Sequence, residues 1–432
     1  MTSPSWTQQL GRRFEQCLSA VCHIRSWSMT EHAWGIVVAA ALMAALSGLP
    51  MSTGLYAENG ETKALKLGYV ELADDPRYVG QGLGSGILFE DLGRPYQASQ
   101  VALEDARMIG RVIRVAFSME KATESSVDAL VQRISAWREA DDVHFILADL
   151  PAAALKDLAH RTVDRPLLLF NVSAAEDSLR GVDCSANVVH TYPSESMLSD
   201  ALIQYLVVKK WNRMLVLQGP APADADMVAA LQRSAKKLHA SIVEVRPFLL
   251  SNDPHNREQS NIVLMTSGPN YDVVYVADSS GEFGRYVPYS TYLPRPVVGS
   301  AGLMATAWSW TWDRDAATQL QHRYEKFSPR RRMNGADWAA WEAVKAVTQS
   351  VVRSRSTAFE AVRAFLLSDQ LSLDTVKGNP GSFRPWDHQL RAPVLLSTAD
   401  AVIERAPLPQ FLHQTNVLDT LGVDAPETTC RL

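Results

Sequence analysis

The sequence predicts an α/β protein made of two doubly wound parallel-sheet lobes with a ligand cleft between them. Three observations lead to this prediction. The chain has 432 residues, which is longer than one typical domain, and 47% of them are hydrophobic. Short apolar runs alternate with amphipathic stretches of helical spacing, as in βαβ units. The same alternation starts again after residue 190, and two lobes of this kind place their strand ends around a cleft.

Strands and helices alternate regularly in the first lobe. Short runs rich in valine, isoleucine and leucine predict its strands at residues 65–70, 112–117, 144–148 and 166–171. Apolar side chains at helical spacing predict its helices at residues 96–109, 125–139 and 152–162. Because a helix connects each strand to the next, we expect a parallel sheet covered on both faces.

The second lobe repeats this architecture without repeating the sequence. Its strands are expected at residues 213–218, 242–245, 271–277 and 297–299. Its helices are expected at residues 195–209, 225–239 and 256–267. Further helices follow at residues 314–327, 335–353 and 357–366.

The remaining segments complete the predicted domain organisation. Residues 383–391 are expected to form a hairpin that turns at Trp386, Asp387 and His388. We expect lobe one to comprise residues 64–189 and about 300–366. Lobe two is expected to comprise residues 190–299 and about 370–400. Residues 401–432 are expected to form a C-terminal tail that is attached to the rest of the protein.

Five tryptophans lie at informative spacing. Trp308, Trp310 and Trp312 alternate along an expected strand, where side chains two apart share one face. They either pack in the core or form an aromatic wall of the cleft that suits a ring-bearing solute. Trp338 and Trp341 lie three apart on an expected helix and are predicted to be core residues.

The N-terminus indicates export. Basic residues precede an apolar run over residues 34–49, and small residues follow it. This order is typical of a secretory signal peptide, which we place at residues 1–57, with cleavage after Gly54 or Ala57. The run is short for a membrane span, although an uncleaved anchor is the alternative. The expected location of the mature protein is the periplasm.

Export would leave two of the four cysteines in the mature chain. Cys17 and Cys22 belong to the leader, whereas Cys184 and Cys430 follow it. Two cysteines in an oxidising compartment favour one disulfide, and two buried free thiols are the alternative.

Charge argues against nucleic acid as a partner. The net charge is −5, without a basic stretch able to neutralise many phosphates. The cluster Arg330, Arg331 and Arg332 is expected to be a solvated surface between a helix and a loop. A monomer is expected.

No constellation of residues indicates catalysis. The sequence lacks a Gly-x-Ser-x-Gly elbow, and glycine-rich residues 80–86 lack the Lys-Ser/Thr of a phosphate-binding loop. The histidines do not pair at metal-ligand spacing. Asp74 and Asp75 are interpreted as solvated loop charges. We therefore expect a protein that is not an enzyme and that uses neither a metal nor another cofactor.

Several segments, in this order, resemble a known family. They are residues 65–70 with Tyr78-Val79-Gly80, Ala148–Pro151, Pro166–Ala175, Leu179–Gly181, Val274–Ser280 and Val297–Ser300. Over roughly residues 64–365 the chain resembles the branched-chain amino-acid binding proteins, which have the type I periplasmic binding protein fold. The resemblance implies capture of a small-molecule solute and delivery to the membrane permease of an ABC transporter.

Longer motifs resemble one branch of that family more closely. They are Leu92–Tyr96, Asp183-Cys184, Phe383–Asp387, Phe411–His413, Leu418–Gly422 and Cys430-Arg431. They are similar to motifs of the substrate-binding proteins associated with pyrroloquinoline-quinone-dependent alcohol dehydrogenase systems. That branch implies a link to alcohol oxidation metabolism. A non-transport periplasmic accessory of such a dehydrogenase is the alternative function, and a ligand-sensing regulator on the same fold is a third.

The resemblance also implies where a solute would bind. Amino-acid binders of the family hold the ligand carboxylate with Ser/Thr hydroxyls and backbone N–H groups, but here that loop reads Pro151-Ala152-Ala153-Ala154. Its N–H groups could still hold an anion, so a small acid or an alcohol-derived solute replaces an ordinary amino acid as the expected ligand. The candidate contacts, acting through hydrogen bonds and shape, are Tyr78, Ala152, Ala153, Asn171, Ser173, Ala175, Asp278, Ser279 and Glu282.

Overall fold

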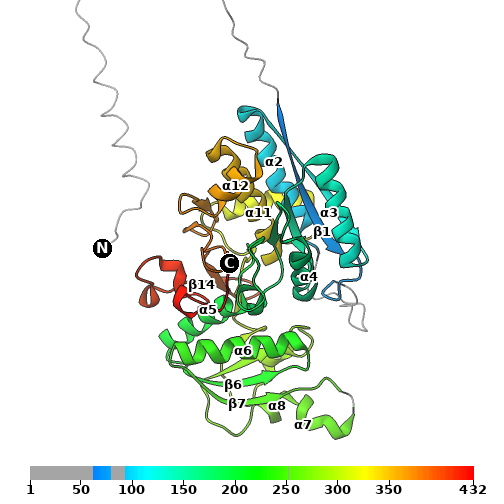
Figure 1. Cartoon of the computed structure of the whole chain (residues 1–432). Helices are drawn as coiled ribbons and strands as arrows, with labels where there is room; N and C mark the ends of the chain where they lie inside the picture. The colour runs from blue at the N-terminus through cyan, green and yellow to red at the C-terminus, as the bar shows by residue number, and fades with distance from the viewer. Residues whose placement is uncertain (1–61, 79–92, 252) are drawn as a thin grey trace, which may run out of the picture. The chain divides into compact units, whose positions relative to one another are not determined.

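Two separate parallel sheets organise the computed structural model, which describes residues 62–78, 93–251 and 253–432 (Figure 1). The first sheet has the order β2-β1-β3-β4-β5. Its strands are β1 (Lys63–Leu72), β2 (Val115–Glu124), β3 (Phe145–Asp149), β4 (Leu168–Asn171) and β5 (Val188–His190). The second sheet has the order β7-β6-β8-β9. Its strands are β6 (Arg213–Gln218), β7 (Ser241–Pro247), β8 (Val273–Ala277) and β9 (Val297–Gly299).

Helices cover both faces of the first sheet. One face carries α2 (Tyr96–Ile113), α11 (Gly335–Ser354) and α12 (Phe359–Leu366), and the other carries α3 (Val127–Asp141) and α4 (Ala152–Thr162) (Figure 1). The side chains of β1 alternate between the two cores. Tyr69 packs with the first group of helices and Val70 with the second. The predicted class, α/β with doubly wound parallel sheets, is confirmed.

The second sheet packs against α5 (Glu195–Val208) and α6 (Pro222–Lys237) on one face. Near the other face the predicted helix at 256–267 is broken. It consists of α7 (Arg257–Ser260) and α8 (Ile262–Met265), and α9 (Val287–Ser290) lies beside α8. Asn261 causes the break because its backbone is extended and its side chain accepts the N–H of Leu264, 3.1 Å away, as a helix cap.

Short antiparallel strands follow in the last third of the chain. β10 (Met304–Thr306), β13 (Val394–Ser397) and β14 (Val402–Ala406) form one sheet, and β11 (Leu373–Asp374) pairs with β12 (Pro380–Gly381). None of these strands was predicted, whereas α10 (Ala317–Phe327) was. The predicted hairpin at 383–391 is present, because Phe383 and Leu390 pair as antiparallel partners across a turn at 385–387.

The expected strand at Trp308–Trp312 is wrong, because the segment turns. The Ser309 and Thr311 hydroxyls lie 2.8 Å apart, and the Trp312 N–H donates to the carbonyl of Ser309 over 3.0 Å. Local hydrogen bonds of this kind compete with strand pairing. Trp308 and Trp312 are buried in the core of the first sheet, while Trp310 is 39% exposed. The three rings therefore do not share a face, and the core interpretation holds for two of them. Trp338 and Trp341 are core residues, as predicted.

The surface interpretation of the arginine cluster is wrong for its middle member. Arg331 is only 6% exposed and donates to the Gly93 carbonyl over 2.6 Å and to the Asp337 carboxylate over 2.7 Å. Arg330 is exposed, as expected, and Arg332 stacks on the ring of Trp310.

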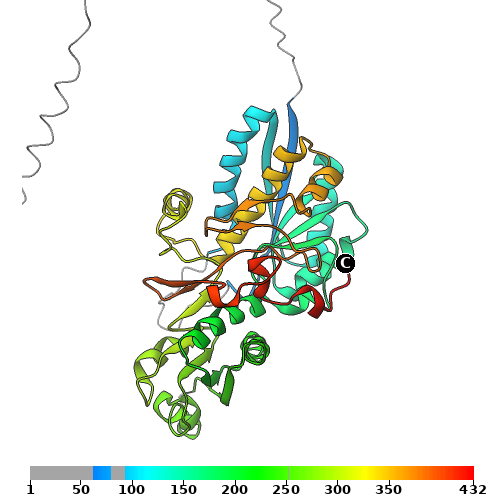
Figure 2. The ribbon, with the colours of Figure 1, turned by 90° about the vertical axis from the view of Figure 1, so that its left-hand side faces the viewer.

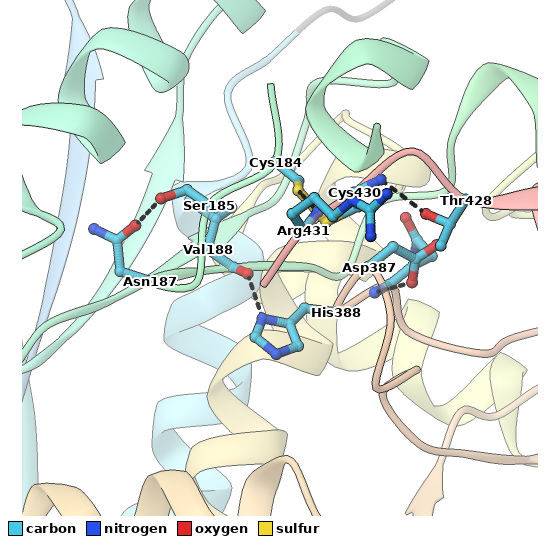
Figure 3. The surroundings of a disulfide bond; sticks show 10 residues. Cys184, Ser185, Asn187, Val188, Asp387, His388, Thr428, Cys430 and Arg431 are labelled. Carbon is cyan, nitrogen blue, oxygen red and sulfur yellow. Dashed lines mark hydrogen bonds between the residues drawn. A yellow bond between two sulfur atoms is a disulfide. The ribbon is translucent and has the colours of Figure 1, made fainter. Parts of the chain in front are cut away.

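A disulfide joins Cys184 to Cys430, which confirms the favoured interpretation of the two mature cysteines (Figure 3). The C-terminal segment, red in Figure 2, ends beside the first sheet, where Cys184 lies in the loop between β4 and β5. In Figure 3, His388 of the hairpin meets the Val188 carbonyl next to the disulfide, at 3.1 Å. The proposed signal peptide and glycine-rich residues 80–86 lie outside the described residues.

The described residues lack two features, a membrane-spanning helix and a metal-binding cluster. None of the helices there has the length and hydrophobicity required to cross a membrane. No group of three or more His, Cys, Asp or Glu side chains in the same residues could hold a metal ion.

Candidate functional site

The carboxyl ends of β1, β3 and β4 meet at one edge of the first sheet. Because the three strands are parallel neighbours, the segments that follow them emerge side by side. These segments are residues 73–78, 150–153 and 172–176. The sequence predicted candidate contacts in all three.

Asp149, the last residue of β3, lies at the centre of this edge. Its side chain is fully buried and accepts hydrogen bonds from the Tyr78 hydroxyl over 2.9 Å and from Arg77 Nη2 over 3.2 Å. Arg94 Nη1 lies 3.6 Å away on its other side. We define the Asp149 cluster as Asp75, Arg77, Tyr78, Arg94, Asp149 and Ser173.

Arg77 connects three strand ends within this cluster. Its Nε and Nη2 atoms bind both oxygens of Asp75, and Nη1 donates to the Ser173 hydroxyl over 2.9 Å. Asp75 is fully buried, so its interpretation as a solvated loop charge is wrong. A planar guanidinium suits this role because it can bind a carboxylate with two parallel N–H bonds.

Burial dominates the electrostatics of the cluster. It raises the pKa of Asp149, although the charge of Arg77 and hydrogen bonds from Ser173 and Tyr78 act in the opposite direction. Burial, followed by the negative charge of Asp149, also raises the pKa of Tyr78, whose hydroxyl therefore keeps its proton. The Tyr78 ring lies against the guanidinium of Arg94, 4.5 Å from its centroid. Tyr78 is thus fixed as a neutral wall of the site.

Ala152 and Ala153 occupy the first turn of α4. Pro151 is the N-cap residue, and no side chain caps the first turn. The helix start belongs to the same edge as the Asp149 cluster, since Asp149 lies only three residues before Ala152. Its N–H groups carry the partial positive charge of a helix N-terminus.

Asn171 and Ala175 shape the loop that follows β4. The Asn171 side-chain oxygen accepts the N–H groups of Ser173 and Ala174, and its amide donates to the Ala174 carbonyl over 2.8 Å. Asn171 is fully buried, and its hydrogen bond to the Ser173 N–H holds Ser173 in place. The Ala175 carbonyl accepts the N–H of Glu195 over 2.8 Å and joins this loop to α5.

The second-sheet candidates lie in the loop after β8. Both Asp278 oxygens accept hydrogen bonds from that loop, including those from Phe283 N at 2.9 Å and Gly284 N at 2.7 Å. Asp278 is 3% exposed. Ser279 is exposed and Glu282 is half-buried. Among the described residues, no hydrogen bond or ion pair joins this loop to the Asp149 cluster.

An ion pair links the β4 loop to the helices of the second sheet. Asp177 pairs with Arg233 of α6 and accepts the Ser196 N–H over 3.0 Å and its hydroxyl over 2.7 Å. Nearby, burial and the negative charges of Asp177 and Glu176 raise the pKa of Glu195 to about 8. The sequence did not single out these residues, because neither their spacing nor their type differs from that of ordinary surface charges.

A separate pocket of about 480 Å³ is lined by the hairpin at 383–391 and the C-terminal tail. Its polar groups are used by the tail itself, since His413 pairs with Asp424 at 3.2 Å and Arg391 pairs with Asp419 at 2.7 Å. It contains none of the predicted contacts.

Comparison with known proteins agrees with this architecture. Residues 90–281 match the model of a family described as periplasmic binding protein. No curated protein matches the sequence.

Solved structures of similar fold include solute-binding proteins of ABC transporters and amino-acid binding proteins. A leucine-, isoleucine-, valine-, threonine- and alanine-binding protein from Brucella ovis has a TM-score of 0.61 and 14% identity, over 80% of this chain and 92% of that one. A branched-chain amino-acid ligand-binding protein from Burkholderia xenovorans LB400 has a TM-score of 0.60 and 16% identity, over 79% and 95%. A solute-binding protein from R. palustris, in complex with benzoate, has a TM-score of 0.57 and 12% identity, over 85% and 100%. The fold is therefore the type I periplasmic binding protein fold.

Proposed function

We propose that this protein is the periplasmic substrate-binding component of an ABC-type importer and captures a small organic solute. The observation that carries the proposal is the Asp149 cluster beside the uncapped start of α4, at the carboxyl ends of parallel strands. Folds of this class bind ligands at that position. The matched family model and similar structures are those of binding proteins.

The proposal includes the division into two lobes that close on the solute. Lobe one, residues 64–189 and about 300–366, contributes Tyr78, Ala152, Ala153, Ser173 and Ala175, with Asn171 shaping the loop. Lobe two, residues 190–299 and about 370–400, contributes Ser279 and Glu282. Asp278 supports its own loop, because its carboxylate is bound to backbone N–H groups. Closure of two lobes around a solute is a known use of this geometry.

The proposal also covers location and partners. The leader at residues 1–57 directs a monomer to the periplasm, where it delivers the solute to a membrane permease. Sequence motifs such as Phe383–Asp387 are the support for a link to alcohol oxidation. The described residues offer no observation that favours an accessory of the dehydrogenase over solute capture.

A thermal-shift screen tests the proposal. The chain from residue 58 is heated with short alcohols, aldehydes, carboxylic acids, amino acids and pyrroloquinoline quinone. A ligand at 100 times its dissociation constant adds about 2.7 kcal/mol to the free energy of unfolding. We expect a saturable rise in the melting temperature with one solute class. Folded, ligand-free protein that responds to none of these classes would contradict solute capture.

A further inference from the structure

The C-terminal end of α2 exposes large apolar side chains. Met108 is 52% exposed, Ile109 41% and Val112 83%. Met108 and Val112 are four residues apart, so they lie side by side on the helix, and Ile109 borders them. The opposite side of α2 is buried in the core of the first sheet. These three side chains therefore add nothing to the packing of α2, and they form an apolar surface over its last two turns.

Basic side chains surround this apolar surface. Arg107 and Arg111 lie one turn apart on the same part of α2, Arg114 follows the helix directly, and all three are exposed. Of the two acidic residues of α2, Asp105 forms an ion pair with α10, and Glu104 lies farther from the end of the helix. We define the α2 patch as Arg107, Met108, Ile109, Arg111, Val112 and Arg114.

The α2 patch lies at the edge of the first sheet where the chain enters the fold. β1 begins at Lys63, which pairs with Val115, the first residue of β2, and α2 ends just before β2. Figure 1 shows the start of β1 beside the end of α2. Before Lys63 the sequence carries the apolar run over residues 34–49. This edge is therefore the part of the described fold that is nearest, along the chain, to the segment expected to meet the membrane during export.

The patch is also far from the proposed solute site. α2 begins two residues after Arg94 of the Asp149 cluster and has 18 residues. A helix of that length spans about 27 Å. The α2 patch occupies the other end of this helix, so a partner bound there leaves the Asp149 cluster uncovered.

The end of α11 adds positive charge at the same edge. α11 packs along α2, and α12 follows it to the start of β3, where the rings of Phe359 and His144 stack with centroids 4.9 Å apart. Arg353 and Arg355, at the end of α11, are exposed. Glu360 of α12 is an exposed acidic neighbour, and the acidic end of α3 lies on the opposite face of the sheet. Basic residues thus outnumber acidic ones on this side of the edge, although the whole chain has a net charge of −5.

We propose that the α2 patch docks on the surface of an anionic phospholipid bilayer. Apolar side chains on one side of a helix insert at the boundary between headgroups and acyl chains. Arginines beside them donate hydrogen bonds to lipid phosphates and are attracted by the negative surface. A second copy of this chain is a poorer partner, because a two-fold contact would bring the arginines of two patches together. The inference goes beyond the proposed function, since it concerns how the protein stays beside the membrane and does not depend on solute capture.

Sedimentation with vesicles tests the inference. The chain from residue 58 is mixed with vesicles of phosphatidylcholine alone and with vesicles that contain phosphatidylglycerol and phosphatidylcholine in equal parts. We expect binding to the anionic vesicles to be at least tenfold tighter. High salt should reduce this difference, because it screens exposed charges. Folded protein that binds both kinds of vesicle equally, or neither, would overturn the inference.

A double charge variant tests the role of the arginines. Arg107→Gln/Arg111→Gln removes two exposed charges of the patch and should bind anionic vesicles at least tenfold more weakly. Arg257→Gln/Arg330→Gln is the matched control, because it changes the net charge equally at exposed positions elsewhere. The control should bind like the natural protein. Equal weakening in both double variants would show that net charge, and not the patch, governs binding.

A second pair of variants tests the apolar contact. Val112→Ser removes the most exposed apolar side chain of the patch and should weaken vesicle binding at least threefold. Val182→Ser is the matched control, because Val182 is 78% exposed in a loop outside the patch. If Val112→Ser binds as tightly as this control, the apolar side chains do not insert and docking through the patch is wrong.

The remaining measurements separate the outcomes. Melting temperatures close to that of the natural protein show that the variants are folded. If sedimentation velocity shows a dimer that the α2 variants dissociate, the patch binds a second copy and the lipid inference falls. In the thermal-shift screen the α2 variants should respond to solutes like the natural protein. Loss of vesicle binding with normal solute binding therefore bears on the α2 patch alone, and failure of the solute screen bears on the proposed function alone.

Discussion

At the scale of single residues, the buried carboxyl groups of this protein have two kinds of surroundings, with and without a close charged partner. Asp75 and Asp149 are paired with the guanidinium of Arg77. Glu342 of α11 is also fully buried, but among the described residues neither oxygen of its carboxylate has a hydrogen-bond partner. Lys345, one turn away, is 4.0 Å from it. Burial raises the pKa of Glu342 to about 7, while Lys345 and Lys377 lower it.

Glu342 should make stability depend on pH. An unfolded chain releases this proton near the ordinary value of 4.5, whereas the folded protein keeps it up to about pH 7. Glu342 therefore stabilises the fold below pH 4.5, and its contribution is lost as the pH rises from 4.5 to 7. Replacing it by glutamine removes this loss. Relative to the natural protein, Glu342→Gln should gain up to about 3 kcal/mol between pH 5 and pH 8.

Chemical denaturation at several pH values measures this difference. Glu360→Gln on α12 is the matched control, because Glu360 is exposed. A stability difference between Glu342→Gln and the natural protein that stays constant from pH 5 to pH 8 would show that Glu342 is ionised in the folded state.

At the scale of elements, one arginine fastens the start of α11 to the loop before α2. Arg331 binds the Gly93 carbonyl and the carboxylate of Asp337. Asp337 also accepts the N–H of Asn334 over 2.9 Å, and the Asn334 side chain accepts the N–H of Asp337 over 3.0 Å. This reciprocal pair is a capping box. The ion pair and the cap of α11 therefore share one carboxylate.

Arg331→Met should destabilise the fold by about 3–5 kcal/mol, since it leaves Asp337 buried without its charged partner. Arg330→Met makes the same chemical change one residue earlier, at an exposed position, and should cost less than about 0.5 kcal/mol. Urea denaturation of both variants checks the prediction. Equal midpoints for the two would show that Arg331 contributes no more than a surface charge.

Elements formed by local pattern were predictable, and elements formed by distant pairing were not. Residues 152–162 and 213–218 are α4 and β6 with the bounds that the sequence indicates. β10 was missed because three residues carry little periodicity and its register depends on pairing Met304 with Ser397. In the site, the family resemblance indicated Tyr78 and Ser173 as candidates, and both lie in loops that follow strands of the first sheet. Arg77 carries no such signal, since its role arises only when three strand ends meet.

At the scale of the whole molecule, the C-terminal tail is attached to the hairpin at 383–391 by ion pairs and to the loop before β5 by a disulfide. Asp419 of the tail binds Arg384 over 3.0 Å and Arg391 over 2.7 Å. Farther along, the Cys184–Cys430 disulfide joins residues separated by 246 positions. The tail is therefore held by buried ion pairs, which salt screens only weakly, and by a disulfide, which depends on the redox state.

Removing the disulfide should loosen the tail before it unfolds the protein. The chain-entropy model sets an upper limit of about 5.5 kcal/mol for a loop closed by residues 246 positions apart. The double variant Cys184→Ser/Cys430→Ser should lose less than this limit, because the Asp419 ion pairs still hold the segment before Cys430. Limited proteolysis should cut the tail faster in the variant and in the reduced natural protein. Reductant should not change the melting temperature of the variant, which controls for its other effects. If the natural protein keeps the same melting temperature and cleavage rate with and without reductant, the disulfide does not contribute to holding the tail.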